Sequence, residues 1–356
     1  MTTPHAPIIR WFSDIELAHR PLVGGKGASL GELTRAGFST PPGFVVTTRA
    51  FEDFLASSPA TGTIRARIAA ADANDLEALD RLSKAVRREF EQTALPAALA
   101  SEVRLAWERL CGGDAALPVA VRSSATGEDS AEASFAGLQE THLWVQGWPA
   151  IEQTLRACWA SLYSVEAVSY RRHRLLPEQQ MAMGVVIQRM VSARAAGVMF
   201  TRSPTSGDRS VIAIEGSWGL GSCIVSGEVT PDKFVVSKVT GEILHRTVSC
   251  KSVRHVPDID RSGVRSEPVP EEAQRTACLS DAQLHELVRI AKQLENHYGC
   301  AQDIEWALAD EATGNAVYLL QSRPETIWAR RERKPAAAAS TNAFDHVIAA
   351  LGGRKD

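Results

Sequence analysis

The segment from Ser280 to Arg323 constrains the fold more than any other stretch of this sequence. Ser280 and Gln283 form a possible capping box, and Gly299 ends the pattern that follows, so we expect a helix between Ser280 and Gly299. Its apolar face consists of Leu284, Leu287, Val288, Ala291 and Leu294. Two strands are expected next, at 303–308 and 317–323, joined by a turn at Gly314 and Asn315. The fold must therefore combine helices with a sheet.

The rest of the chain mixes strands and helices without regular alternation. Further strands are expected at 44–48, 118–121, 184–191, 196–201, 211–215 and 233–238, with 184–191 and 196–201 adjacent in one sheet. Helices are expected between a glycine-rich turn at Gly24 and Gly37, within 50–110 and over 151–172, and a polar turn over 122–130. No repeat of fixed period is present. The pattern favours an α+β or mixed-sheet protein over a barrel.

Composition argues against several classes of protein. A chain of 356 residues is long enough for two domains or one large bilobal one. Its 39 basic and 42 acidic residues give a net charge of -3, which argues against coating nucleic acid by bulk charge. No apolar run approaches the ~18 residues of a membrane span. The six scattered cysteines are expected to be reduced. The first residues do not have the pattern of a secretory signal peptide, so we expect a cytoplasmic location.

Phosphate binding would have to rely on scattered basic residues. The sequence contains neither a P-loop nor a Gly-x-Gly-x-x-Gly fingerprint. Lys26 in a glycine-rich turn, and Arg122 and Arg323 beside expected strands, are candidates for binding phosphates. Each of them alone is more often a solvated surface residue.

A more specific signal lies in the last two expected strands. Asp303 and Glu305 have i, i+2 spacing and project from one strand face, and Gln321 and Arg323 have the same spacing on the next strand. Two carboxylates, an amide and a guanidinium could thus face one cleft. Because Mg²⁺ prefers hard oxygen ligands, a magnesium and phosphate site is plausible. The alternative is a solvated strand face with cross-strand ion pairing.

Five motifs together carry a family resemblance. They are Val23–Glu32, Pro41–Phe44, Val121–Thr126 with Ala133–Gly137, Gly197–Thr201, and Gln321–Thr326. In this order, over about residues 11–328, they resemble the nucleotide-binding domain shared by phosphoenolpyruvate synthase, pyruvate phosphate dikinase and rifampin phosphotransferase. The resemblance implies a bilobal ATP-grasp fold, with ATP between the lobes. It also implies an N-terminal lobe over 1–192, with a helical insertion at about 50–110, a C-terminal lobe over 193–328 and a linker-like tail over 329–356.

The resemblance assigns roles residue by residue. Lys26 and Arg122 become phosphate ligands, and Asp303 and Arg323 lie at the phosphate end. Glu305 and Gln321 become the Mg²⁺ ligands. Met190 and Val191 fall where the family holds adenine, and Glu215 is a candidate for the ribose. The loop from Ser124 to Gly137 resembles a flexible cover over the phosphates.

One family feature is missing from this sequence. Family enzymes pass the phosphoryl group through a histidine in a Thr-Ser-His context, and none of the nine histidines here has that context. We therefore expect an ATP-binding subunit whose acceptor histidine is on a partner subunit, similar to phenylphosphate synthase, with phenol as the final acceptor. Three alternatives remain: the ATP-binding part of a pyruvate-dependent synthase, a non-catalytic nucleotide sensor, and a fragment of a longer enzyme.

Overall fold

The computed structural model describes residues 6–72, 75–127, 140–258, 262–310, 316–326 and 328. The chain divides into one compact unit, Met1–Pro324, and a second, Glu325–Asp356. In the second unit, the Trp328 amide donates a hydrogen bond to Glu325 Oε1 over 2.9 Å. The expected turn at Gly314 and Asn315, the segment 133–137 and the tail from 329 lie outside the described residues. The first unit is described below.

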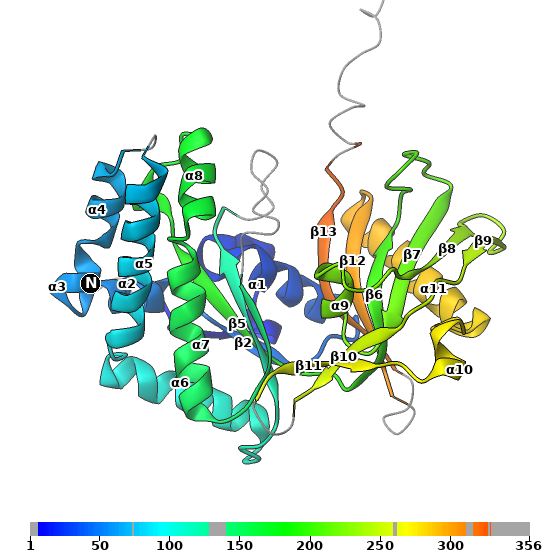
Figure 1. The fold of residues 1–356 in the computed structure, drawn as a ribbon, viewed down its shortest axis with the longest axis horizontal. Coiled ribbons are helices and arrows are strands. Elements are labelled where there is room, and N and C mark those ends of the chain that lie inside the picture. The colour runs from blue at the N-terminus through cyan, green and yellow to red at the C-terminus, as the bar shows by residue number, and fades with distance from the viewer. Residues whose placement is uncertain are drawn as a thin grey trace, which may run out of the picture. The chain divides into compact units, whose positions relative to one another are not determined.

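The first sheet has five antiparallel strands in the order β1-β2-β5-β3-β4. They are β1 (Ile9–Trp11), β2 (Gly43–Val46), β3 (Val119–Ala125), β4 (Thr141–Val145) and β5 (Met183–Arg189). Its helices are α1 (Arg20–Arg35), α2 (Thr48–Ala56), α3 (Pro59–Gly62), α4 (Ile64–Ala70), α5 (Leu76–Gln92), α6 (Ala97–Cys111), α7 (Trp148–Ser161) and α8 (Val165–His173). Short 3-10 helices span Phe12–Asp14, Leu17–His19 and Glu178–Gln180. The expected helices within 50–110 are present as α2 to α6 (Figure 1).

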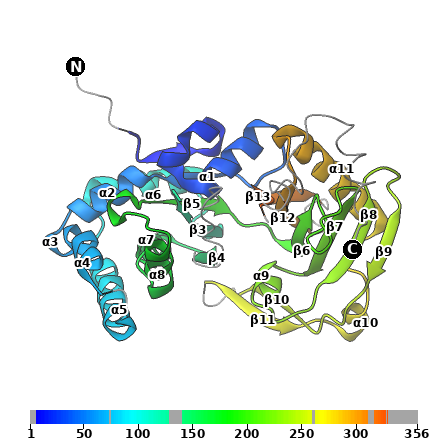
Figure 2. The ribbon, with the colours of Figure 1, turned by 90° about the horizontal axis from the view of Figure 1, so that it is seen from above.

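The second sheet has six antiparallel strands in the order β13-β12-β6-β7-β8-β9. They are β6 (Ala193–Phe200), β7 (Val211–Trp218), β8 (Asp232–Ser237), β9 (Ile243–Thr247), β12 (Gln302–Ala309) and β13 (Val317–Pro324). A two-stranded sheet, β10 (Val253–Pro257) with β11 (Val264–Pro268), lies beside it, with helices α9 (Ser222–Val225), α10 (Glu271–Gln274) and α11 (Asp281–Tyr298) (Figures 1 and 2). The expected α+β class is confirmed.

Helix α11 has the ends that its sequence predicts. The Ser280 side chain accepts from the Gln283 amide, the Gln283 side chain accepts from the Ser280 amide, and Gly299 ends the helix with a left-handed φ of 67°. Its apolar face packs on the second sheet with Ile304 and Trp306, which are fully buried. The opposite face of β12 therefore carries Asp303 and Glu305, as the strand alternation predicts.

Three expectations are corrected by the structure. Residues 184–191 and 196–201 are not adjacent in one sheet, because β5 belongs to the first sheet and β6 to the second. Residues 122–125 are not a turn, since β3 continues to Ala125 and pairs with β5 along its whole length. The helix expected over 151–172 is two helices, α7 and α8, because the Ser164 side chain caps a new helix start.

Helix α1 contributes to the cores of both sheets. Its residues Val23, Ala28 and Leu30 pack with Val45 and Val186 of the first sheet. Leu33, one turn further on, packs in the core of the second sheet. The remaining helices of the N-terminal part cover the other face of the first sheet, around Phe44, Val121 and Ile187. In the part of the chain that the structure describes, no helix meets the length and apolarity needed to span a bilayer.

Candidate functional site

The polar residues of β12 and β13 form matched cross-strand pairs. Glu305 lies opposite Gln321, and Asp303 lies opposite Arg323. Arg323 Nε is 3.5 Å from Asp303 Oδ2. On the other side of β12, Val198 and Phe200 of β6 lie opposite Glu305 and Asp303. Directly opposite residues share a sheet face, so these six side chains belong to one surface.

A small cavity of about 70 Å³ opens on this surface. It is lined by Val198, Phe200, Asp303, Ile304, Glu305, Gln321 and Arg323. It has room for a few water molecules, one ion or one phosphate group. A larger cavity of about 910 Å³ lies elsewhere, between Phe38, Arg289 and His297, and none of the candidate site residues lines it.

Arg122 reaches this surface from the first sheet. Its Nη2 donates to Glu305 Oε2 over 2.9 Å and to Gln321 Oε1 over 3.0 Å. Its Nη1 donates to the Leu320 carbonyl over 2.8 Å. The structure thus brings together Arg122 and the two predicted metal ligands, from strands about 180 to 200 positions apart in the sequence.

A β-bulge makes the third of these contacts possible. The register of β12 and β13 shifts after Glu305, so that Trp306 lies opposite Leu319 and Leu320 has no partner residue on β12. A bulge leaves one residue outside the strand ladder and re-aims its groups. The Leu320 carbonyl then accepts from Arg122 instead. Sequence reasoning missed Leu320, and also Val198 and Phe200, because neither a backbone carbonyl nor an apolar wall has a chemical signature in the sequence.

The Arg122 guanidinium is almost completely enclosed, with 7% of the residue exposed. Its Nε is buried and has no hydrogen-bond partner among the residues that the structure describes. The Glu305 side chain is 43% exposed, so this end of the contact is open to solvent. A buried guanidinium with unused donor capacity beside an open edge is suited to binding an oxyanion such as phosphate.

Lys26 lies on the same side of the first sheet as Arg122. Arg122 is opposite Val186, and Val186 packs against α1, the helix that carries Lys26. The Gly27 amide donates to Ser124 Oγ over 3.0 Å, two residues beyond Arg122 on β3. Lys26 is 7% exposed. It thus lies in a helix that packs on the Arg122 face, but it does not line the small cavity.

Gly24 fixes how closely α1 approaches β3. Its φ is 73°, which breaks the helix into two parts at this residue. A Cβ at this position would lie 2.0 Å from the Ser124 carbonyl oxygen. Ser124 Oγ also donates to the Val23 carbonyl over 2.8 Å. The glycine-rich turn predicted from the sequence is present only as this break at Gly24, and Lys26 lies in the helical part that follows it. At Gly24 the two backbones approach more closely than a residue with a Cβ permits.

Of the residues predicted for the nucleoside, one lies further along the second sheet and two lie in the connection between β5 and β6. Glu215 on β7 lies opposite Val198, which lies opposite Glu305, so Glu215 and Glu305 share a face two strands apart, or about 10 Å. Glu215 Oε1 is 3.1 Å from Lys233 Nζ. Met190 and Val191 are half-buried in the short connection from β5 to β6, where the Met190 amide donates to the Pro118 carbonyl over 3.0 Å.

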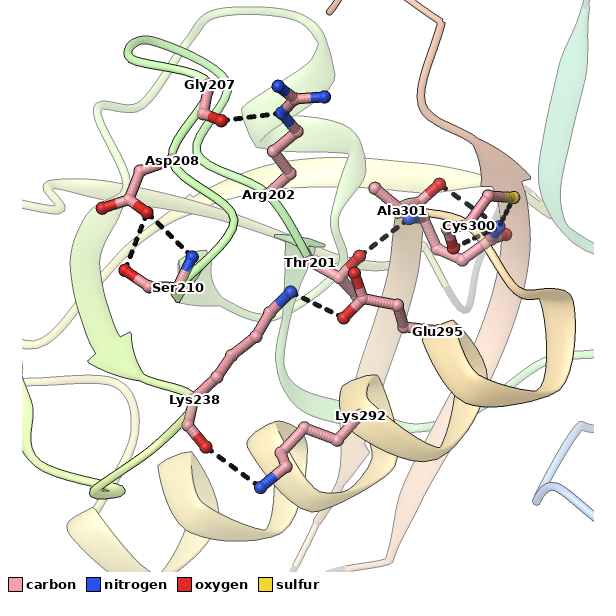
Figure 3. Close-up of polar contacts among 11 residues, drawn as sticks. Thr201, Arg202, Gly207, Asp208, Ser210, Lys238, Lys292, Glu295, Cys300 and Ala301 are labelled. Carbon is pink, nitrogen blue, oxygen red and sulfur yellow. Dashed lines mark hydrogen bonds and ion pairs between the residues drawn. The ribbon is translucent and has the colours of Figure 1, made fainter. Parts of the chain in front are cut away.

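The loop after β6 anchors the strand ends that carry the site (Figure 3). The Gln302 amide donates to Thr201 Oγ1 over 2.8 Å, next to Asp303 and Phe200. Arg202 Nε donates to the Gly207 carbonyl over 2.7 Å, and Asp208 accepts from the Ser210 amide over 2.8 Å. The contact of Thr201 with Gln302 joins the ends of β6 and β12, and the other two contacts close the loop on itself.

The donor set at Glu305 and Gln321 fits a magnesium ion. Carboxylate and amide oxygens are hard ligands, and Mg²⁺ is commonly held by one or two protein groups with phosphates and water completing its shell. Within the described ranges no cluster of three or more His, Cys, Asp or Glu residues could hold a metal by itself. Glu305 and Gln321 would supply two ligands to such a cation, and phosphate oxygens or water would supply the others. The cover predicted at Ser124–Gly137 begins in β3, and its part at 128–137 lies outside the described residues.

Comparisons with known proteins identify the family of this chain. Residues 20–343 match the family model described as "Pyruvate phosphate dikinase, AMP/ATP-binding domain". The crystal structure of D-alanyl-alanine synthetase A from Vibrio cholerae covers 82% of the chain at 10% identity, but its TM-score of 0.26 is too low to support an argument.

Among curated proteins, the chain is 39% identical over 320 residues to "Probable phosphoenolpyruvate synthase" of Methanothermobacter thermautotrophicus, covering 89% of this chain and 46% of that protein. It is 38% identical to "Phosphoenolpyruvate synthase" of Aeropyrum pernix, covering 93% and 44%. It is 41% identical to "Rifampicin phosphotransferase" of a Streptomyces species, covering 88% and 35%. The chain spans less than half the length of each of these relatives. Because the family model matches most of its residues, the chain belongs to the family of pyruvate phosphate dikinase AMP/ATP-binding domains.

Proposed function

We propose that this chain binds Mg·ATP and serves as the ATP-binding component of a dikinase-type phosphotransferase. The observation that carries the proposal is the contact of Arg122 with Glu305 and Gln321, because it gathers a phosphate-binding cation and two hard oxygen ligands at one point. Family membership supports the same role. We also propose that this chain is a separate subunit of that enzyme.

The residues of the site would act by positioning and charge neutralisation. Phosphoryl transfer needs little covalent chemistry from the protein, so cations aimed at the moving charge dominate catalysis. Lys26, Arg122 and Arg323 would hold the phosphates, with Asp303 orienting Arg323. Glu305 and Gln321 would hold Mg²⁺, which neutralises phosphate charge when bound.

The nucleoside would lie along the second sheet, away from these charges. Met190 and Val191 would contact adenine in the connection between the sheets, and Glu215 would accept hydrogen bonds from the ribose. This placement is based on the cross-strand neighbours Glu215, Val198 and Glu305, which lie on one face of the second sheet.

The reaction that we propose transfers phosphoryl groups through a histidine. A histidine nitrogen attacks the β-phosphorus, the bond from that phosphorus to the oxygen shared with the α-phosphate breaks, and AMP leaves with that oxygen. Water then removes the terminal phosphate, and the phosphoryl group that remains on histidine passes to the final acceptor. None of the nine histidines in this sequence has the Thr-Ser-His context. We propose, by similarity to phenylphosphate synthase, that the acceptor histidine is on a partner subunit.

We propose phenol as the final acceptor, by similarity to phenylphosphate synthase. Pyruvate is the second candidate, and it is favoured by the relatives that are named phosphoenolpyruvate synthase. The acceptor site would belong to the partner, so the two candidates are separated by supplying each acceptor to the assembled system.

Two measurements test this proposal. Calorimetric titration of the chain with ATP and Mg²⁺ should show binding, and Arg122→Ala should weaken it. The chain should also form AMP from labelled ATP when it is mixed with the histidine-carrying remainder of the Methanothermobacter thermautotrophicus relative, whose own ATP-binding part has been removed. Absence of ATP binding would refute the proposal. Binding with recovery of intact ATP, and no labelled histidine in the mixture, would instead indicate a nucleotide sensor.

A further inference from the structure

Arg122 holds the same oxygen atoms that are predicted to bind the metal. Its Nη2 is shared between Glu305 Oε2 and Gln321 Oε1, at 2.9 Å and 3.0 Å. We propose that Arg122 and a divalent cation compete for these two oxygens, so that the cation binds well only when a triphosphate draws Arg122 away. This inference rests on the proposed function, because it assumes that Glu305 and Gln321 are the metal ligands.

The competition follows from the geometry of Gln321. The Gln321 amide oxygen has two lone pairs, and one of them accepts the hydrogen bond from Arg122 Nη2. A cation that binds between Glu305 and Gln321 would lie within a few ångströms of the guanidinium. Like charges at such a distance repel strongly in a partly enclosed site. This repulsion opposes binding of a cation while Arg122 stays at Glu305 and Gln321, and it is relieved when Arg122 moves away.

Burial makes this displacement costly unless a new partner is available. Arg122 is only 7% exposed, so water cannot fully replace the hydrogen bonds that it loses. A phosphate group can replace them, because guanidinium and phosphate form charge-assisted hydrogen bonds. The Nε of Arg122, which lacks a partner among the described residues, supplies a further donor for a phosphate oxygen.

The proposed exchange has a functional consequence. Binding of the cation and of the triphosphate becomes mutually dependent, since each removes the obstacle to the other. Free divalent cation should then bind weakly at Glu305, although the ligands are in place. Arg122 would thus occupy the metal ligands before the nucleotide binds and contact the phosphates of the nucleotide afterwards.

Metal binding without nucleotide tests the competition directly. We would titrate the chain with Mn²⁺ and measure free Mn²⁺ by electron paramagnetic resonance, comparing wild type with Arg122→Met and Arg122→Lys. Arg122→Met should bind Mn²⁺ about tenfold more tightly, the size expected when a charge-assisted hydrogen bond no longer opposes binding. Arg122→Lys keeps the charge but not the planar fork, and its affinity should lie between the other two. It also carries the test if Arg122→Met fails to fold.

Two controls separate this explanation from simpler ones. Lys233→Met removes a positive charge from the same row of the sheet, three strand spacings or about 14 Å from Glu305, and should change Mn²⁺ affinity less than about twofold. Adding Glu305→Gln to an Arg122 variant should abolish the gained affinity. Unchanged or weaker Mn²⁺ binding in both Arg122 variants would overturn the inference. An equal gain in Lys233→Met, or a gain that survives Glu305→Gln, would overturn it as well.

Failure of the inference can be told apart from failure of the proposed function. If wild type binds Mg·ATP but the Arg122 variants show no gain in Mn²⁺ affinity, only the competition is wrong. If wild type does not bind ATP, the proposed function itself is wrong.

Discussion

Asp232 on β8 and Lys251 form an ion pair from which water is excluded. Both side chains are 0% exposed, and Lys251 Nζ lies 2.6 Å from Asp232 Oδ1. Asp232 also accepts hydrogen bonds from two backbone amides, those of Ser249 and Cys278, each over 2.9 Å. One carboxylate thus joins the segments that precede β10 and α11 to the second sheet. We expect Lys251→Met to destabilise the protein strongly, because it leaves a buried carboxylate without its counter-charge.

The magnitude follows from what each substitution leaves unpaired. Removing one partner of a buried ion pair costs about 3–5 kcal/mol, so this is the expected loss for Lys251→Met. Asp232→Ala should lose more, since it also leaves two buried amides without acceptors at about 1–3 kcal/mol each. In the double variant both charges are gone, while the two amides and the Ser249 carbonyl, which accepts from Lys251 Nζ over 3.0 Å, lose their partners. The two amides account for a loss of about 2–6 kcal/mol, and because neither charge is left unpaired, the loss should be about 6–10 kcal/mol below the sum of the single losses.

Urea denaturation followed by far-ultraviolet circular dichroism measures these free energies of unfolding. Lys84→Met is the matched control, because Lys84 pairs with Asp80 over 2.7 Å while 68% of its side chain is exposed. Such an exposed pair contributes about 0.3–0.5 kcal/mol. If Lys251→Met were no more destabilising than Lys84→Met, or if the two single losses were additive in the double variant, the reasoning on burial would be refuted.

Four further predictions concern the site and its surroundings. Arg323→Ala should lower AMP formation about 10²-fold or more in the mixed assay, the range for removing a preorganised charge-stabilising donor; wild-type rates would remove Arg323 from the site. Glu305→Gln should shift the Mg²⁺ titration of activity to higher concentration, and an unchanged titration would exclude a ligand role. Burial raises the pKa of the Glu140 carboxyl, but the His142 ring, whose Nε2 lies 3.3 Å from Glu140 Oε2, and the charge of Arg87 outweigh burial and lower the pKa from its ordinary value of 4.5. Glu140 should therefore stabilise the fold above about pH 4.5 and lose this contribution as the pH falls through its lowered pKa, so the difference in unfolding free energy between wild type and Glu140→Gln should shrink in acid; a pH-independent difference would contradict this. Gly24→Ala should lower the free energy of unfolding by about 3 kcal/mol or more, because its Cβ would lie 2.0 Å from the Ser124 carbonyl oxygen. Gly112→Ala is the control: Gly112 has a similar φ of 60° but open space around it, so the loss should be about 1–2 kcal/mol. Equal losses by thermal denaturation would argue against the close contact.

Local patterns in the sequence predicted the parts of the fold that depend on local physics. The caps of α11 and its apolar face were predictable because the helix ends are set by residues three or four positions apart. The i, i+2 spacing predicted that Asp303 and Glu305 share a face, and the register of β12 with β13 pairs them with Arg323 and Gln321. Alternation alone does not say which strands pair, so this match depended on the two strands being consecutive.

Local sequence patterns could not predict the contacts between segments that are distant in the sequence. The apolar run of β5 is the same whether β6 is its neighbour or starts another sheet, and the structure places β6 in another sheet. The polar residues after Arg122 suggested a turn, yet they pair with β5 because the α1 backbone and Glu140 satisfy their hydroxyls. The bulge at Leu320 depends on packing across β12 and has no residue signature. The lobe boundary at 192 and 193 and the roles of the site residues stay predictions.

The shared position of α1 limits how the protein can be divided. All strands of the second sheet come from residues 193–324, which suggests a segment that could be produced alone. Leu33, however, is fully buried in the core of that sheet, and Ser29 Oγ donates to the Ser322 carbonyl over 2.6 Å. A truncation that begins at Ala193 would open a leucine-sized void beneath β13 and remove a partner from its backbone. Material from the first 35 residues would have to be supplied, by fusion or as a peptide, before that half could fold as a compact body.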